Sequence, residues 1–561
     1  MFLPTTKDEV IQRGWNQLDI ILITGDTYID SPHIGIAIIG NLLYKAGYKV
    51  GIIAQPLEDE IKRLGEPRLF WGVSAGSIDS MVANYTAIKK KRKQDDLTPA
   101  GKNDRRPDRA SIYYTNLIKR HYKKTKPIVL GGIEASLRRI AHYDYWDDTI
   151  RRSILFDSKA DILVYGMAEQ TIINLAEYIS KNKKIDDLRG ICYISKKGRE
   201  DYLPLPPFEK VRQDIQSFID MFNIFYENND PLTAKGLFQR HNDRYLIHNP
   251  PAFYPTQEQI DSFFELDYER DVHPFYKKQG YVRALDTIRF SITSHRGCYG
   301  ECSFCSISIH QGRRVISRSI RSILKEVEEI THLKDFNGII SDVGGPTANM
   351  YGIDCQKKSI YGGCKGKCCL YPTICKKLNI DHHAQIKLLK KIRSLSGIKR
   401  VFVASGLRYD MILNDKKNGI NYLHEIIQHH VSGQLKIAPE HTEGEVLSLI
   451  RKPSKEYLLE FKKHFDLLNK RLNKNQFLTY YFMSAHPGCE MSHMYKLKQA
   501  LIRELKMIPE QVQIFTPLPS TYSSLMYYTE RNPFTGEKIF VEKNLKKKQR
   551  QKDIIQKKNF N

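Results

Sequence analysis

The sequence predicts an α/β protein with two main parts, an N-terminal doubly wound parallel sheet and a C-terminal partial (β/α)6 barrel. Short apolar runs alternate with helical segments in both halves of the chain, a pattern typical of parallel sheets covered by helices. Glycine, proline and polar residues gather directly after the apolar runs, where sheets of this kind bind ligands. At 561 residues, the chain is long enough for two or three domains.

Residues 1–195 are predicted to form the first α/β domain. Apolar residues at helical spacing predict a helix over Ile34–Ala46. The charged stretch Lys89–Asp108 contains proline and glycine and is predicted to be a surface loop. The strands are expected at Asp19–Thr24, Tyr48–Ala54, Leu69–Ser74, Pro127–Gly131 and Asp161–Tyr165.

Residues 196–283 are predicted to be an irregular connector, because prolines recur through this region. Residues 284–540 return to the β–α alternation and are predicted to form the barrel. Within it we expect a cysteine-rich insertion at 350–378, and the lysine-rich tail 541–561 is expected to be disordered. The barrel strands are expected at Phe290–Ser294, Gly338–Val343, Val401–Ala404, Leu435–Ala438, Phe477–Met483 and Val512–Phe515.

Three cysteines follow the first barrel strand. Cys298, Cys302 and Cys305 have the spacing CxxxCxxC, and Phe304 stands just before the last of them. Three thiolates can hold three irons of a 4Fe–4S cluster, which usually takes four cysteines. The fourth iron stays open to a substrate or cofactor, as the metal of a catalytic zinc site does. The triplet therefore indicates an enzyme that uses a 4Fe–4S cluster with S-adenosylmethionine.

Two other interpretations of the triplet are weaker. A zinc knuckle needs a fourth ligand, for which His295 and His310 are candidates, but zinc sites usually pair their cysteines as CxxC. A disulfide with a spare thiol does not suit a chain that reads as cytoplasmic. The N-terminus lacks an apolar signal core, and no apolar run approaches the roughly 20 residues of a membrane span.

The composition leaves a second class of function open. With 88 Lys and Arg against 63 Asp and Glu, the formal net charge is +25, which favours contact with nucleic-acid phosphates. A lysine-rich proteome produces the same excess, and no RNA-binding motif stands out. The alternative function is thus an RNA-binding or RNA-modifying protein in which the cluster is structural.

A second cysteine group lies in the predicted insertion. Cys355, Cys364, Cys369 and Cys375 share a loop rich in glycine and lysine, and Cys368 is an additional member. A loop with so little apolar content needs a cross-link to hold a fold. We expect an auxiliary site with either a second Fe–S cluster or a structural zinc ion.

Many longer stretches accompany the cysteine motif, and together they resemble the YgiQ family of radical-SAM proteins over nearly the whole chain. In these proteins the reaction is not established. The stretches that carry the resemblance are Asp26–Asp30, Gly131–Arg139, His142–Trp146, Asp157–Asp161, His310–Arg313, Asp342–Tyr351, Ser405–Asp410, Ala438–Thr442, Ala485–Gly488 and Met526–Thr529.

The resemblance implies a cluster that cleaves S-adenosylmethionine reductively, giving a 5′-deoxyadenosyl radical that removes a hydrogen atom from an unknown substrate. It implies an electron donor such as flavodoxin or ferredoxin. Phe304 would pack near the adenine, with plain core packing as the alternative. Gly344, Gly345 and Pro346 form the strand end that accepts the methionine amino group. Ser405, Arg408 and Glu440 would meet the ribose or carboxylate, or else serve as structural polar residues at loop starts.

The N-terminal domain is similar to the flavodoxin-like, cobalamin-binding domains of some radical-SAM enzymes. Those domains often carry the motif DxHxxG, in which the histidine can bind cobalt. The nearest string here runs from Asp30 through His33 to Gly35 and has a different spacing. Cobalamin is therefore a further candidate cofactor, beside loss of the cofactor or another nucleotide-like ligand.

Overall fold

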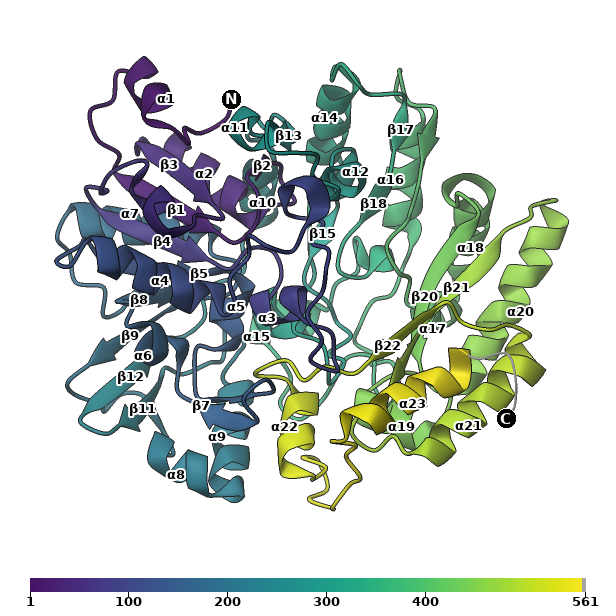
Figure 1. The fold of residues 1–561 in the computed structure, drawn as a ribbon. Helices are drawn as coiled ribbons and strands as arrows, with labels where there is room; N and C mark the ends of the chain where they lie inside the picture. Colours follow the sequence, from purple (N-terminus) through teal and green to yellow (C-terminus); the bar gives the residue numbers. More distant parts are fainter. Residues whose placement is uncertain (557–561) are drawn as a thin grey trace. The chain divides into compact units, whose positions relative to one another are not determined.

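The computed structural model describes residues 1–556, and the chain divides into two compact units (Figure 1). Unit 1 comprises residues 1–254 and 262–289, and unit 2 comprises residues 255–261 and 290 onwards. None of the helices in the described residues is both long and apolar enough to cross a membrane.

A nine-stranded sheet organises unit 1, in the order β10-β11-β12-β9-β8-β5-β4-β1-β3. Its parallel part runs β3-β1-β4-β5-β8, which is the flavodoxin-like order 2-1-3-4-5. Ile20 of β1 pairs with Val50 of β3 and with Phe70 of β4, so these strands begin in register. The parallel strands are β1 (Ile20–Thr24), β3 (Val50–Ala54), β4 (Phe70–Ser74), β5 (Ile128–Gly131) and β8 (Ile162–Val164).

Helices cover both faces of this sheet, because alternate strand residues point to opposite sides. Ile20 and Leu22 belong to the core cluster that includes residues of α2 (Gly35–Lys45) and α7 (Glu169–Ser180). Helix α4 (Ala110–His121) packs along β4 (Figure 1). The predicted doubly wound sheet is confirmed.

The region 196–283 differs from the irregular connector that we expected. β9 (Ile191–Ser195), β10 (Leu203–Leu205), β11 (Leu237–His241) and β12 (Arg244–His248) extend the sheet, with α8 (Phe208–Gln213) and α9 (Ile215–Glu227) between β10 and β11. A turn at Asn242, with φ of 54°, joins β11 to β12. Because Leu203 N–H donates to Gly236 O of the β11 side, the nitrogen of Pro204 faces the open edge. An edge strand tolerates proline there, since no hydrogen bond is required.

Unit 2 contains the partial barrel, built on parallel pairs between strands that follow one another in the sequence. Thr293 pairs with Gly344, Ile340 with Val401, and an isolated parallel bridge joins Leu407 to Ile437. Further pairs link β20 to β21 and β21 to β22. The strands are β14 (Ser291–Thr293), β17 (Ile339–Ile340) with β18 (Asp342–Gly344), β19 (Arg400–Val401), β20 (Gln434–Glu440), β21 (Phe477–Ser484) and β22 (Gln511–Ile514).

One apolar cluster fills the interface between these strands and their helices. Ile323, Val327 and Ile330 place one stripe of α14 in it, at the spacing expected for an amphipathic helix. The main covering helices are α14 (Ile320–Thr331), α16 (His383–Arg393), α18 (Gly419–Glu425), α20 (Lys455–Arg471) and α21 (Met491–Ala500) (Figure 1).

Most of the basic tail differs from the expected disorder, because Leu545–Gln556 form helix α23. Ile554 and Ile555 are buried in the unit 2 core. Gln551 is fully buried, accepts a hydrogen bond from Ala485 N–H and donates one to Cys489 O. Two apolar residues and one amide therefore dock a helix whose composition is otherwise highly charged. The last part of the expected tail, residues 557–561, lies outside the described residues.

Candidate functional site

The cysteine loop begins where the first barrel strand ends. After β14, His295–Arg296 (β15) pair with Ile316–Ser317 (β16) and close the base of the loop. Gly297 has a φ of 81°, and a Cβ there would lie 1.9 Å from Arg314 O. The two strands of this base therefore approach each other closely only because residue 297 has no side chain.

Two of the three sulfur atoms face a common space. A Cβ on Gly300 would lie 3.3 Å from Cys298 Sγ and 3.6 Å from Cys302 Sγ. Glycine at this position keeps a gap open between the sulfurs. Cys305 follows in a tight turn, because its N–H donates to Cys302 O at 3.0 Å. The donor set and this gap fit a cluster held by three thiolates.

Backbone hydrogen bonds anchor the loop at Ser303. Its N–H donates to Ile450 O at 3.0 Å, and its carbonyl accepts from Ser523 N–H at 2.9 Å. The Ser523 hydroxyl lies 2.7 Å from Nε2 of His486, whose Nδ1 lies 2.8 Å from Pro487 O. A carbonyl only accepts, so Nδ1 carries the proton and Nε2 accepts from Ser523. These contacts fix the loop to the end of helix α19 (Gly444–Ile450) and to the first turn of helix α22 (Tyr522–Thr529).

Two of the three thiols of the loop have raised pKa values. Burial raises the pKa of Cys298 above its ordinary value and raises the pKa of Cys305 to about 12. Without a bound metal these side chains are therefore protonated at neutral pH. Assembly of a cluster displaces the protons, since thiolate is the form that binds metal.

One of the two histidines considered as a zinc ligand already has partners within the chain. Within residues 1–556, no three His, Cys, Asp or Glu side chains are arranged to hold one ion. Both ring nitrogens of His295 are engaged, with Nε2 3.1 Å from Thr347 O and Nδ1 2.9 Å from Ser294 Oγ. His295 is thus not available as the fourth ligand of a zinc knuckle.

The predicted glycine-rich strand end lies beside the loop. A Cβ on Gly345 would lie 2.6 Å from the ring of His295, and one on Gly344 would lie 2.7 Å from Ser405 Oγ. Pro346 follows directly, and Cys298 Sγ lies 3.4 Å from the hydroxyl of Thr347. Packing of neighbouring side chains thus accounts for both glycines.

Two of the predicted polar cofactor residues have partners within the chain. The Ser405 hydroxyl donates to Asp342, which also accepts from the N–H groups of Ala404 and Ser405. Glu440 lies 3.4 Å from Lys452 Nζ and is buried, with a φ of 68° at the end of β20. Burial raises the pKa of Glu440 above its ordinary value.

Arg408 reaches the cysteine loop itself. Its NH1 group lies 3.7 Å from Cys302 Sγ, whereas Nε and NH2 donate to the carboxylate of Asp410 at 2.8 and 2.6 Å. Sequence reasoning assigned Arg408 to the ribose or carboxylate and did not select Asp410. The spacing Arg-x-Asp was the available signal, because Arg408 is the N-cap residue of helix α17 (Tyr409–Asn414) and Asp410 lies in the first turn of that helix.

Phe304 packs against the main apolar core of unit 2. This contact agrees with the alternative of core packing. It leaves the predicted adenine contact untested.

The cysteines of the second group differ in their surroundings. Cys355 and Cys369 are buried in one apolar cluster, which Cys375 and Cys298 also contact. Cys375 N–H donates to Cys369 O at 2.9 Å, whereas Cys368 faces Arg451, whose NH1 lies 3.1 Å from its sulfur. Three of the four predicted ligands thus share a cluster beside the first cysteine loop, and Cys364 lies outside that cluster.

In unit 1, the strand ends of β1 and β4 form the switch point at which this topology usually binds ligands. Here the guanidinium of Arg106 occupies that position, donating to Asp26 at 2.7 Å and to Ala75 O at 2.9 Å. Arg106 comes from the predicted surface loop 89–108 and is fully buried instead. It is paired with Asp95 as well, at 3.0 Å.

The residues expected to bind cobalamin do not fit that role. Asp30 is buried, and its two oxygens accept from Asn41 Nδ2 and from Glu269 N–H, both at 2.9 Å. The carboxylate that would orient His33 is therefore committed elsewhere, and Arg106 fills the strand ends. We derive no chemistry from cobalamin in this chain.

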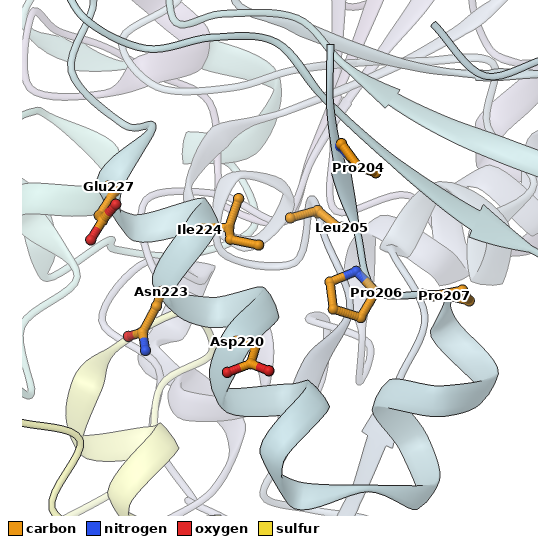
Figure 2. A pocket seen from close by; sticks show the side chains of 8 residues that line it. All are labelled: Pro204, Leu205, Pro206, Pro207, Asp220, Asn223, Ile224 and Glu227. Atoms are coloured by element: carbon orange, nitrogen blue, oxygen red, sulfur yellow. The ribbon is translucent and has the colours of Figure 1, made fainter. Parts of the chain in front are cut away.

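One groove of unit 1 lies between the edge strand β10 and helix α9 (Figure 2). Asp220, Asn223, Ile224 and Glu227 share one face of α9, opposite the prolines that flank Leu205. The lining residues of this groove include no thiol, so they do not supply the cysteine ligands of a cluster.

Comparisons with known proteins identify relatives over nearly the whole chain. The family model described as Radical SAM N-terminal matches residues 2–291. A UPF0313 protein of Fusobacterium nucleatum is 55% identical over 564 residues, covering 100% of this chain and 99% of the relative. A UPF0313 protein of Thermotoga maritima is 47% identical and covers 99% of this chain and 98% of the relative.

Solved structures share the fold. The radical S-adenosylmethionine methyltransferase TsrM from Kitasatospora setae, with cobalamin and a [4Fe-4S] cluster bound, matches with a TM-score of 0.54 at 13% identity. That match covers 91% of this chain and 74% of TsrM. The cobalamin-dependent radical enzyme OxsB matches with a TM-score of 0.50 at 13% identity, covering 93% of this chain and 56% of OxsB. From the sequence relatives and the cysteine motif, this chain belongs to the UPF0313 family, the YgiQ family of radical-SAM proteins.

Proposed function

We propose that this chain is a radical-SAM enzyme in which Cys298, Cys302 and Cys305 hold a 4Fe–4S cluster. The observation that supports the proposal is the gap at Gly300, where two of the sulfurs face one space at 3.3 and 3.6 Å from the missing Cβ. Membership of the radical-SAM family also supports the proposed cluster. The substrate is unknown.

When bound, the cluster and S-adenosylmethionine supply a 5′-deoxyadenosyl radical through one-electron reduction, with a donor of the flavodoxin or ferredoxin class. The chain's own residues orient these groups and exclude water. Gly344, Gly345 and Pro346 are the proposed contacts of the methionine end. Ser405, Phe304 and Glu440 remain proposed contacts of S-adenosylmethionine. Ser405 now bonds Asp342 and Glu440 pairs with Lys452, so binding would require each of them to exchange or share that partner.

The test compares Cys302→Ala with Cys192→Ala after anaerobic reconstitution. Cys192 is a buried cysteine of unit 1 and serves as the matched control. We expect the parent chain and the control to form 5′-deoxyadenosine from S-adenosylmethionine under dithionite, and Cys302→Ala to form none. Equal formation by Cys302→Ala would contradict the proposal.

We further propose a second metal site on Cys355, Cys364, Cys369 and Cys375. Burial of Cys355 and Cys369 beside Cys375 supports it. We propose a second Fe–S cluster at this site, with a structural zinc ion as the alternative, since both are held by four thiolates. Iron, sulfide and zinc counting decides the question. About eight irons per chain, lowered by half in Cys369→Ser, is the expected result; about four irons with one zinc would contradict it.

A further inference from the structure

Arg408 lies deep in unit 2 and is 6% exposed, and its three side-chain nitrogens divide between a carboxylate and a sulfur. Nε and NH2 form a two-pronged ion pair with Asp410, and this pair consumes both oxygens of the carboxylate. NH1 points instead at Cys302 Sγ, 3.7 Å away. A guanidinium is always charged in proteins, so a fixed positive group faces this sulfur.

Gly300 lies beside both the sulfurs and the guanidinium. A Cβ at residue 300 would lie 3.4 Å from Arg408 NH1, 3.3 Å from Cys298 Sγ and 3.6 Å from Cys302 Sγ. The charged group and the two sulfurs therefore converge on one position of the loop.

The backbone of Arg408 is clamped from the glycine-rich strand end. Arg408 N–H donates to Asn349 Oδ1 at 2.8 Å, and Asn349 Nδ2 donates to Arg408 O at 3.0 Å. Asn349 Nδ2 also lies 3.2 Å from His382 Nε2, whose Nδ1 contacts Asp415 at 2.8 Å. Because Asp415 accepts from Nδ1–H, Nε2 is an acceptor, which fixes the orientation of the Asn349 amide.

We infer that the Arg408–Asp410 pair tunes the cluster on Cys298, Cys302 and Cys305, with Arg408 favouring the reduced state and Asp410 opposing it. The inference rests on the proposed function, since it requires a cluster at these cysteines. Hydrogen bonds to cluster sulfurs and nearby charge set the reduction potentials of Fe–S centres. Reduction adds one negative charge, which a donor aimed at Cys302 Sγ stabilises. Both residues act as positioning residues, because they reach the cluster through a cysteine.

Substitutions of Arg408 and of Asp410 are expected to shift the ratio of reduced to oxidised cluster in opposite directions. The parent chain is reconstituted without S-adenosylmethionine, and the solution potential is set so that half of its cluster is reduced. Electron paramagnetic resonance measures the reduced fraction. At that potential we expect the ratio of reduced to oxidised cluster to fall roughly tenfold in Arg408→Met, the factor for one hydrogen bond to a charged group. Asp410→Asn leaves the guanidinium without its counter-charge, so the ratio is expected to rise.

Arg393→Gln is the matched control, because it removes a cation of unit 2 that pairs with Glu425 at 3.3 Å rather than with a sulfur. We expect no shift in this variant. If Arg408→Met fails to retain a cluster, Arg408→Lys keeps the charge without the two-pronged geometry, and its ratio is expected to lie below the parent value. Shifts of the same sign in the Arg408 and Asp410 variants, or no shift in either, would overturn the inference. A parent chain that assembles no cluster would overturn the proposed function itself.

Discussion

Arg106 and Asp26 form a fully buried ion pair, with 2.7 Å between NH1 and Oδ1, at the strand ends of unit 1. Asp26 also accepts a hydrogen bond from Ser77 N–H at 2.6 Å, and a Cβ on Gly76 would lie 2.2 Å from its Oδ1. The crevice that this topology usually offers to a ligand is closed by the chain's own side chains. Arg106 therefore holds unit 1 together at the place where related folds bind cofactors.

Loss of Arg106 should destabilise unit 1 strongly. Arg106→Met leaves the buried carboxylates of Asp26 and Asp95 without their partner, so we expect a loss of about 3–5 kcal/mol in the free energy of unfolding. All three tryptophans lie in unit 1, and their fluorescence in urea reports this transition. Arg68→Ala is the control, because Arg68 pairs with Asp19 while 62% exposed, and it should cost at most about 1 kcal/mol. Equal losses would contradict the role of burial.

The same closed crevice predicts that the chain binds no corrinoid. After incubation with hydroxocobalamin and removal of the free compound, we expect a reconstituted sample to lack corrinoid absorbance. Retention of one corrinoid per parent chain would show that unit 1 opens in solution.

The stability of unit 1 should fall in mild acid because of His142. Burial lowers the pKa of His142 to about 4, whereas an unfolded histidine titrates near 6.5. Between these values the unfolded chain binds one more proton than the folded chain, so stability is lost as the pH falls through this window. Tryptophan fluorescence in urea, recorded at a series of pH values, gives the free energy of unfolding at each pH. In His142→Gln this free energy should fall less steeply with decreasing pH than in the parent. The exposed His383 provides a control substitution that should leave the slope unchanged.

Gly297 should be essential for assembly of the cysteine loop. A Cβ there meets Arg314 O at 1.9 Å, and the φ of 81° disfavours any side chain. Gly297→Ala is therefore expected to reduce bound iron to background while circular dichroism stays close to that of the parent. Gly444 has open space around its Cβ position and lies in helix α19 (Gly444–Ile450), so Gly444→Ala should retain full iron. Normal iron in Gly297→Ala would show that the loop relaxes around the side chain.

Gln551 should contribute to the stability of unit 2 through helix α23. Its amide satisfies Ala485 N–H at 2.8 Å and Cys489 O at 3.0 Å, both in the buried loop after β21. Gln551→Leu leaves these groups unpaired, at a cost of about 1–3 kcal/mol for each buried group. Calorimetry should show a lower melting temperature for unit 2, whereas the exposed Arg550→Ala should melt with the parent. An unchanged melting temperature in Gln551→Leu would contradict a stabilising role for the Gln551 amide.

The sequence by itself determined the fold class and the triplet of cysteines. Both are local patterns: apolar runs at strand and helix spacing, and thiols a few residues apart. The parallel strands of the doubly wound sheet, such as Ile20–Thr24, begin and end within two residues of the predicted ranges. The prediction of an irregular connector over the proline-rich region 196–283 was wrong because edge strands accept proline. Whether a strand lies at an edge depends on its neighbours in the sheet.

Only the tertiary structure decided which partners the polar residues take. Arg106 is one of many cations in a charged stretch, and nothing local shows that it is buried against Asp26, 80 residues earlier. Arg408 meets Cys302 across 106 residues of sequence, because two strand ends converge. Gln551 turns a lysine-rich tail into a docked helix in the same way. Such pairings depend on long-range geometry and on the cost of leaving a buried polar group unpaired, which local sequence does not encode.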